Sequence, residues 1–73
     1  MRYEGTWLWE IMASEQANPS GYRNITQHVV ARSFERAVST FRTEFPDADI
    51  HKVERRNYFS PKMGVLVDPE AVA

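Results

Sequence analysis

The stretch RSFERAVSTFRTEFP, residues 32–46, decides how this chain folds. Ser33 precedes an apolar repeat, and its hydroxyl can accept a hydrogen bond from a free amide of a first helical turn. Pro46 cannot continue a helical backbone ladder. The stretch therefore predicts an amphipathic helix that ends at about Phe45. One buried stripe is expected on it, formed by Phe34, Ala37, Val38, Phe41 and Phe45.

Two strands are predicted on the N-terminal side of this helix. In TWLWEIMA, residues 6–13, strand alternation separates two sets of side chains. One face carries Trp7, Trp9 and Ile11, and the other carries Leu8, Glu10 and Met12. ITQHVVA, residues 25–31, reads as a second strand, paired antiparallel with the first because sequential strands usually neighbour each other. The polar residues 14–24 between them are expected to form a loop.

Two more strands are predicted after the helix. ADIHKVERR, residues 48–56, reads as the third strand. Its apolar residues Ile50 and Val53 are three positions apart, which indicates a bulge or a twist. MGVLVD, residues 63–68, is apolar and β-branched and reads as the fourth strand. Pro69 ends it, and residues 69–73 are expected to be a flexible C-terminal tail.

The order of elements predicts an α+β fold of ββαββ type, with a small antiparallel sheet and one amphipathic helix packed on one face. Residues 1–68 form one domain in this interpretation. A single helix covers one face of such a sheet and leaves the other open. Three apolar residues are expected on that open face, where an apolar strip marks a contact surface. They are Leu8, Met12 and Val30.

The two tryptophans, Trp7 and Trp9, admit two placements. The first puts them beneath the helix, as the counterpart of its phenylalanines. The second puts them on the open face, where they could stack on nucleic-acid bases. The open face could equally pair with a second copy of the chain, because a homodimer would repair the thin core of so short a protein.

Composition excludes several classes of protein. The 73 residues contain no cysteine, so neither a disulfide framework nor a thiolate metal site can form, and a reducing, cytoplasmic location is expected. No apolar run is long enough to span a bilayer, so no membrane association is predicted. The net charge of −1 argues against a dedicated binder of duplex DNA.

Candidate catalytic groups do not form a recognisable site. His28 and His51 fall on different predicted strands, and no set of neighbouring carboxylates has metal-ligand spacing. Asp47 and Asp49 follow a helix end, where turn formation explains them. The glycines are scattered, and no serine stands in a nucleophile elbow. The sequence therefore predicts a non-catalytic protein without metal or cofactor.

A basic and aromatic segment follows the third strand and is the main predicted contact site. Its residues are Arg55, Arg56, Tyr58, Phe59 and Lys62. Arginine beside flat aromatic rings suits hot spots of protein interfaces. The same combination suits single-stranded nucleic acid, through phosphate contact and base stacking. A solvated hairpin is the third interpretation. The near-neutral net charge favours a protein partner over nucleic acid.

The pattern A-x-S-x-x-x-A-x-x-x-F-x-x-x-F-P-x-A-x-I-x-x-V, residues 31–53, resembles one found in small ββαβ proteins of phages and other mobile elements. It covers about a third of the chain and consists of core and capping positions, so it implies a fold and carries over no catalytic residues. The resemblance implies a protein that docks on a host protein and occludes it. That is the function expected here, with a single-stranded nucleic-acid-binding module as the alternative.

Overall fold

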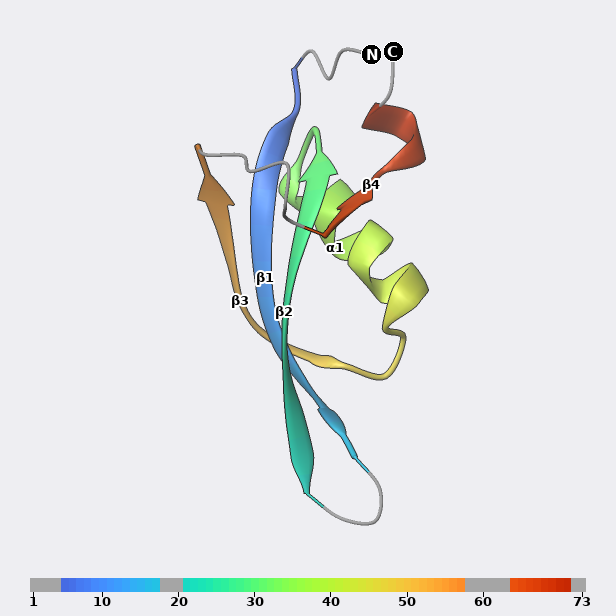
Figure 1. The fold of residues 1–73 in the computed structure, drawn as a ribbon. Coiled ribbons are helices and arrows are strands. Elements are labelled where there is room, and N and C mark those ends of the chain that lie inside the picture. The colour runs from blue at the N-terminus through green and yellow to red at the C-terminus, as the bar shows by residue number, and fades with distance from the viewer. Residues whose placement is uncertain (1–4, 18–20, 58–63, 72–73) are drawn as a thin grey trace.

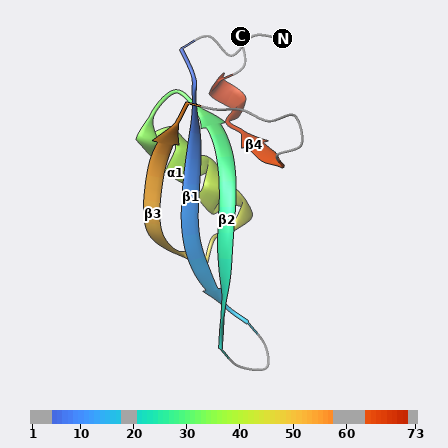
Figure 2. The same cartoon turned by 60° about the vertical axis from the view of Figure 1, so that its left-hand side comes forward.

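The structure, a computed structural model, describes residues 5–17, 21–57 and 64–71. It contains one helix, α1 (Phe34–Glu44), and four strands, β1 (Trp7–Gln16), β2 (Tyr22–Ala31), β3 (Asp49–Arg56) and β4 (Val65–Val67). A 3₁₀ turn, Pro69–Ala71, follows β4. The predicted α+β class, with one helix and four strands, is confirmed. Helix α1 packs across one face of the sheet (Figures 1 and 2).

Helix α1 begins and ends where its capping signals predict. The hydroxyl of Ser33 accepts a hydrogen bond from the amide of Arg36 at 3.2 Å. At the other end the amide of Phe45 donates to the carbonyl of Phe41 at 2.9 Å. The rings of Phe41 and Phe45 are stacked, with their centroids 4.9 Å apart. Phe41 is fully buried and is the largest side chain of the core.

The sheet is mixed, so the prediction of an antiparallel sheet is wrong. Its strand order is β3-β1-β2-β4. Strands β2 and β3 flank β1 in antiparallel pairs, but β4 runs parallel to β2 at the far edge (Figure 1). At that edge, Leu66 of β4 pairs with Val29 and packs against the core. The outer edge of β3 is charged and offers no such apolar contact.

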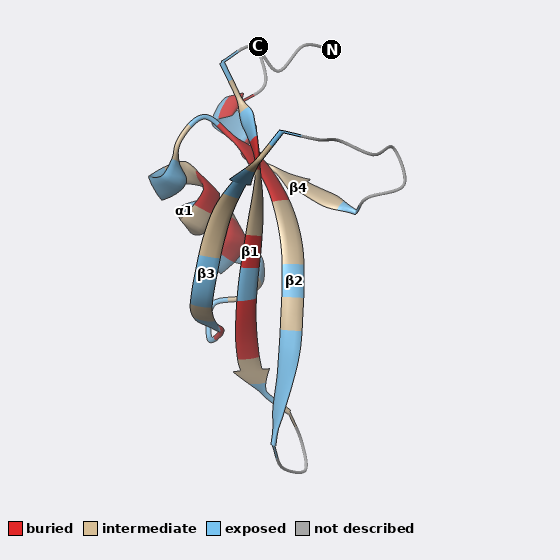
Figure 3. Cartoon of the chain, turned by 90° about the vertical axis from the view of Figure 1, so that its left-hand side faces the viewer, coloured by how far each residue is buried: buried red, intermediate tan, exposed pale blue. Residues whose placement is uncertain are grey.

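Strands β1 and β2 are longer than predicted. They pair from Trp7 with Ala31 to Gln16 with Tyr22, so most of the expected loop 14–24 is strand. Residues 22–24 are exposed because this end of the hairpin extends beyond the helix, and Figure 3 shows that part of β2 as exposed. Gly21 has a φ of +96°, a conformation that glycine adopts without steric cost.

The core lies between α1 and the helix-facing side of the sheet. Its buried members are Ile11, Ala13, Val29, Ala31, Ala37, Phe41 and Ala48. Trp9 packs at its margin, and the indole N–H of Trp9 donates to the carbonyl of Ala31 at 3.0 Å. Trp9 and Ile11 therefore lie on the helix side, as alternation predicts. The expected bulge is present, because the register of β3 against β1 shifts between Met12 and Ala13.

The C-terminal segment is packed against the fold as far as the structure describes it. Residues 69–71, expected to begin a tail, form the 3₁₀ turn, and Ala71 is fully buried. The amide of Asp68 donates to the carbonyl of Val30 at 2.9 Å, and the amide of Ala71 donates to the carbonyl of Asp68 at 2.8 Å. These bonds continue the attachment of β4 to β2 beyond the end of the strand.

Candidate functional site

The apolar strip expected on the open face, the sheet face that α1 does not cover, is only partly accessible. Met12 is 41% exposed, but Leu8 and Val30 are buried at 7% and 4%. Leu8 lies between Val30 and Arg56 in the register of the sheet, and Val67 of β4 pairs with the other side of Val30. Leu8 and Val30 therefore contribute to packing within the chain, and the prediction that they form a contact surface is wrong.

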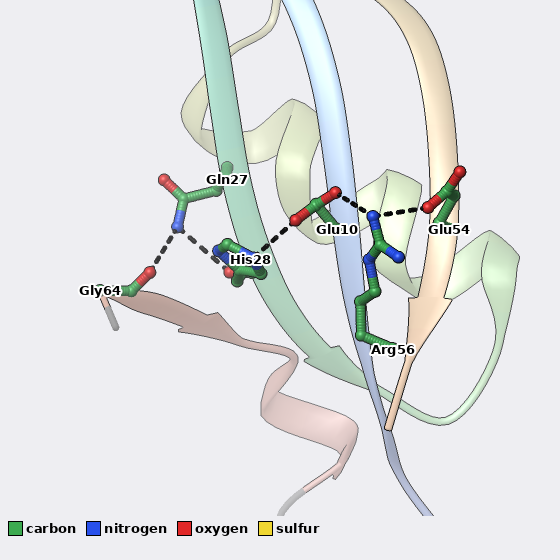
Figure 4. A network of polar contacts seen from close by, with 6 residues as sticks. All are labelled: Glu10, Gln27, His28, Glu54, Arg56 and Gly64. Atoms are coloured by element: carbon green, nitrogen blue, oxygen red, sulfur yellow. Dashed lines mark hydrogen bonds and ion pairs between the residues drawn. The ribbon is translucent and has the colours of Figure 1, made fainter. Parts of the chain in front are cut away.

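A network of charged side chains occupies the middle of the open face (Figure 4). Glu10 on β1 lies between His28 on β2 and Glu54 on β3. Its Oε2 is 3.1 Å from His28 Nε2, and its Oε1 is 2.8 Å from Arg56 Nη2. The same Arg56 nitrogen is 2.7 Å from Glu54 Oε2, and Glu54 Oε1 is 2.5 Å from Lys52 Nζ. Opposite charges thus compensate one another between β1 and β3, and His28 joins the network from β2.

The two carboxylates of this network are held in their ionised form. The hydrogen bond from Arg56 lowers the pKa of Glu10 below its ordinary value, and His28 adds to this effect against the opposing effect of burial. The hydrogen bond from Lys52, with the nearby charge of Arg56, lowers the pKa of Glu54. A general acid at neutral pH needs a carboxyl whose pKa is raised instead. The arrangement therefore suits charge pairing more than proton donation.

Of the predicted basic segment, the structure describes only Arg55 and Arg56. Because side chains alternate along a strand, consecutive arginines point to opposite faces. Arg56 lies on the open face within the charged network, whereas the Arg55 guanidinium lies over the ring of Trp7, 4.2 Å from its centroid, on the helix side. Tyr58, Phe59 and Lys62 lie outside the described residues.

Exposed aromatic rings gather instead at the end of the helix-facing side, beside Arg55. We call Trp7, Trp9, Phe34 and Arg55 the aromatic–arginine patch. Trp7 is 45% exposed and Phe34 is 50% exposed, although Phe34 belongs to the stripe predicted to be buried and the core is one of the two placements predicted for Trp7. The Phe34 ring meets Trp9 edge to face, with centroids 6.3 Å apart. Adjacent to the patch, a shallow hollow is lined by Trp7, Arg55, Arg56 and Asn57.

The exposure of Trp7 and Phe34 follows from their positions in their elements. Each is the first residue of its strand or helix. Periodicity gives the direction of a side chain but not whether an opposing element extends far enough to cover it. The terminal position of both residues is the one signal in the sequence that distinguishes them from Ile11 and Phe41.

The two histidines are not near each other and have different partners. His28 pairs with Glu10, and His51 Nε2 is 2.7 Å from the hydroxyl of Ser14. Within residues 5–17, 21–57 and 64–71, no three histidine, cysteine, aspartate or glutamate side chains are placed to hold a metal ion. In the same part of the chain no helix is long and apolar enough to cross a bilayer.

A second ionic cluster, which the sequence does not predict, joins α1 to the C-terminal segment. Arg36 donates from Nε and Nη2 to the two carboxylate oxygens of Asp68 at 3.0 and 2.8 Å. The Asp68 side chain is 1% exposed, and Arg36 also contacts the exposed Glu70 at 2.8 Å. The hydrogen bond from Arg36 lowers the pKa of Asp68. This fork anchors the C-terminal segment to α1 through a buried carboxylate.

Comparison of the chain with models of known families, with curated protein sequences and with solved structures gave no match.

Proposed function

We propose that this chain is a small, non-catalytic binding protein that docks on another protein through the aromatic–arginine patch and occludes the surface it covers. The observation that carries the proposal is the joint exposure of Trp7 and Phe34 beside Arg55. Large exposed apolar groups that gather in one place mark interaction sites. Tryptophan and arginine are also the residues enriched among interface hot spots.

The patch is suited to binding because its members are already oriented. Trp9 is fixed by its hydrogen bond to Ala31, and Phe34 rests against the edge of Trp9. The guanidinium of Arg55 rests on Trp7. Side chains that are ordered before association lose less conformational entropy when they bind. A partner of matching shape therefore meets a firm apolar surface with one cation at its border.

Charge favours a protein partner over single-stranded nucleic acid. Binding of nucleic acid depends on cations that are available to phosphates. Arg56 and Lys52 are paired with Glu10 and Glu54, and the net charge of the chain is −1. The stack of Arg55 on Trp7 is the one observation that favours nucleic acid, because base stacking uses the same groups. The experiment must therefore distinguish a protein partner from single-stranded nucleic acid.

The experiment places a photo-crosslinking amino acid at position 34, in cells that naturally carry the gene, with position 22 as the matched control. Tyr22 is the most exposed large hydrophobic residue among the described ones, at 75%. It lies nine positions along β2 from Ala31, which pairs with Trp7, and therefore about 30 Å from the patch. We expect one protein to be captured from position 34 and not from position 22.

The captured protein is then titrated with purified variants. Trp7→Ser and Phe34→Ser should each weaken binding roughly 30-fold, because truncating a hot spot costs about 2 kcal/mol or more. Tyr22→Ser should bind like the unmodified chain. Equal binding by all variants would refute the patch as the contact surface.

A labelled, mixed-sequence single-stranded oligonucleotide is titrated in parallel at about 50 and 200 mM salt, the range over which phosphate contacts weaken. We expect no binding at either concentration. Binding that falls steeply with salt and is lost in Arg55→Ala would replace the proposal with the nucleic-acid alternative.

A further inference from the structure

Strand β3 lies at one edge of the sheet, and no strand of the described residues pairs with the outer side of residues 49–55. Strand β3 forms a ladder with β1 on one side and closes that side of the sheet (Figure 2). Such an edge presents a row of backbone amides and carbonyls to any strand that can pair with it. We propose that a second copy of this chain binds there, by antiparallel pairing of β3 with β3 about a twofold axis. The proposal does not depend on the function proposed above.

Symmetry limits the registers that such a dimer can use. A twofold axis perpendicular to the sheet keeps the helix-bearing faces of both copies on the same side. Residues opposite each other on neighbouring strands share a face. One residue of β3 must therefore lie opposite the same residue of the second copy, with the twofold axis passing between the two. In the regular part of β3, after the bulge, the candidates near the middle are Lys52, Val53 and Glu54.

Charge selects one of these three registers. An axis at Lys52 places two ammonium groups opposite each other. An axis at Glu54 opposes two carboxylates and brings Lys52 against Arg56 of the second copy. An axis at Val53 places Lys52 opposite Glu54 of the second copy, twice by symmetry, with the two valines paired between them. Opposite charges across a strand pair are stabilising and like charges are destabilising, so the register centred on Val53 is favoured.

The composition of the edge explains why the partner is a second copy and not an arbitrary strand. Six of the eight residues of β3, in the sequence DIHKVERR, are charged or histidine. Charged edges discourage pairing with apolar strands, which offer no charges opposite Lys52 and Glu54. A second β3 supplies an acid opposite the base and a valine opposite the valine. The outcome is one continuous sheet with both helices on the same face.

The first experiment measures molecular mass by sedimentation over a range of protein concentrations. We expect the unmodified chain to approach twice its monomer mass of 8.5 kDa as concentration rises. Lys52→Glu and Glu54→Lys should each shift the equilibrium to monomer, because each opposes like charges across the axis. The double variant K52E/E54K restores the opposite pairing and should recover the dimer. Circular dichroism of each variant confirms that the monomer is folded.

The second experiment keeps the proposal testable if a charge variant fails to fold. The chain has no cysteine, so Val53→Cys introduces a single thiol at the proposed axis. A short thiol–thiol cross-linker should join two Val53→Cys chains and should leave Tyr22→Cys chains unjoined. A chain that stays monomeric at high concentration would overturn the proposal. So would a dimer that is neither broken by charge reversal nor cross-linked at position 53.

Discussion

At the scale of the residue, exposure depends on where along its element a side chain falls. Trp7 and Ile11 share one face of β1, yet Ile11 is fully buried and Trp7 is 45% exposed. Phe34 and Phe41 differ in the same way on α1. Alternation and helical period are properties of the backbone, so the sequence predicts directions well. Coverage depends on elements elsewhere in the chain, and for that reason the aromatic–arginine patch is not predicted.

The acid response of the protein also belongs to the residue scale. The folded state lowers the pKa of Glu10 below its ordinary value of 4.5, so the unfolded chain binds more protons as the pH falls toward and below this value. The stability from Glu10 is therefore complete above pH 4.5 and lost as the pH falls through the folded-state pKa. Glu10→Gln should cost about 1 kcal/mol at neutral pH and should show a shallower loss of stability in acid.

The measurement is urea unfolding at a series of pH values from neutral to about pH 3. Glu44→Gln, which removes an exposed carboxylate from the end of α1, is the control and should follow the unmodified chain. If Glu10→Gln lost stability in acid as steeply as the unmodified chain, the charged network would not be the source of the pH dependence.

At the scale of the element, local signals predict the helix better than the strands. The cap at Ser33 and the stop at Pro46 determine both ends of α1, because each acts through its immediate neighbours. Residues 14–16 and 22–24, expected to be loop, form strand, because pairing along the hairpin satisfies their backbone groups whatever their side chains are. The polarity of side chains in this region indicates exposure to solvent. A strand that extends beyond the core is exposed in the same way as a loop, so polarity does not distinguish the two.

The cap gives a direct test of this interpretation. Ser33→Ala removes the side-chain acceptor for the amide of Arg36 and should destabilise the protein by about 1 kcal/mol. Ser39→Ala makes the same chemical change at an exposed position within α1 and should be neutral or slightly stabilising, because alanine has the higher helix propensity. The midpoint temperature of thermal unfolding should therefore fall for Ser33→Ala and should stay unchanged or rise slightly for Ser39→Ala.

At the scale of the whole molecule, contacts between distant segments decide the topology. Strand β4 follows β3 in sequence but pairs with β2 at the opposite edge of the sheet (Figure 1). The fork between Arg36 and Asp68 then joins α1 to the residues after β4. The two residues are 32 positions apart, so their pairing could be recognised only after the chain had been folded back on itself.

The contribution of the Asp68 contact to stability can be compared with that of the Glu70 contact, because both carboxylates bind Arg36. Asp68→Asn removes the buried carboxylate and should reduce the free energy of unfolding by about 1–3 kcal/mol. Glu70→Gln removes an acceptor whose side chain is 69% exposed, and it should change stability little because exposed ion pairs are weak. If urea unfolding gave the same loss in the free energy of unfolding for both variants, burial would not distinguish the two contacts.

The sequence by itself determined the single amphipathic helix with its two ends, the strand character of its neighbours, the bulge or twist in the third strand and the shared face of Ile11 and Trp9. These features depend on backbone periodicity and on groups within a few residues of each other. Only the tertiary structure decided that β4 lies parallel to β2, that Leu8 and Val30 are buried and that Trp7 and Phe34 are exposed. Each of these depends on which distant element covers a side chain, and that is a property of the packed molecule and not of any short stretch of sequence.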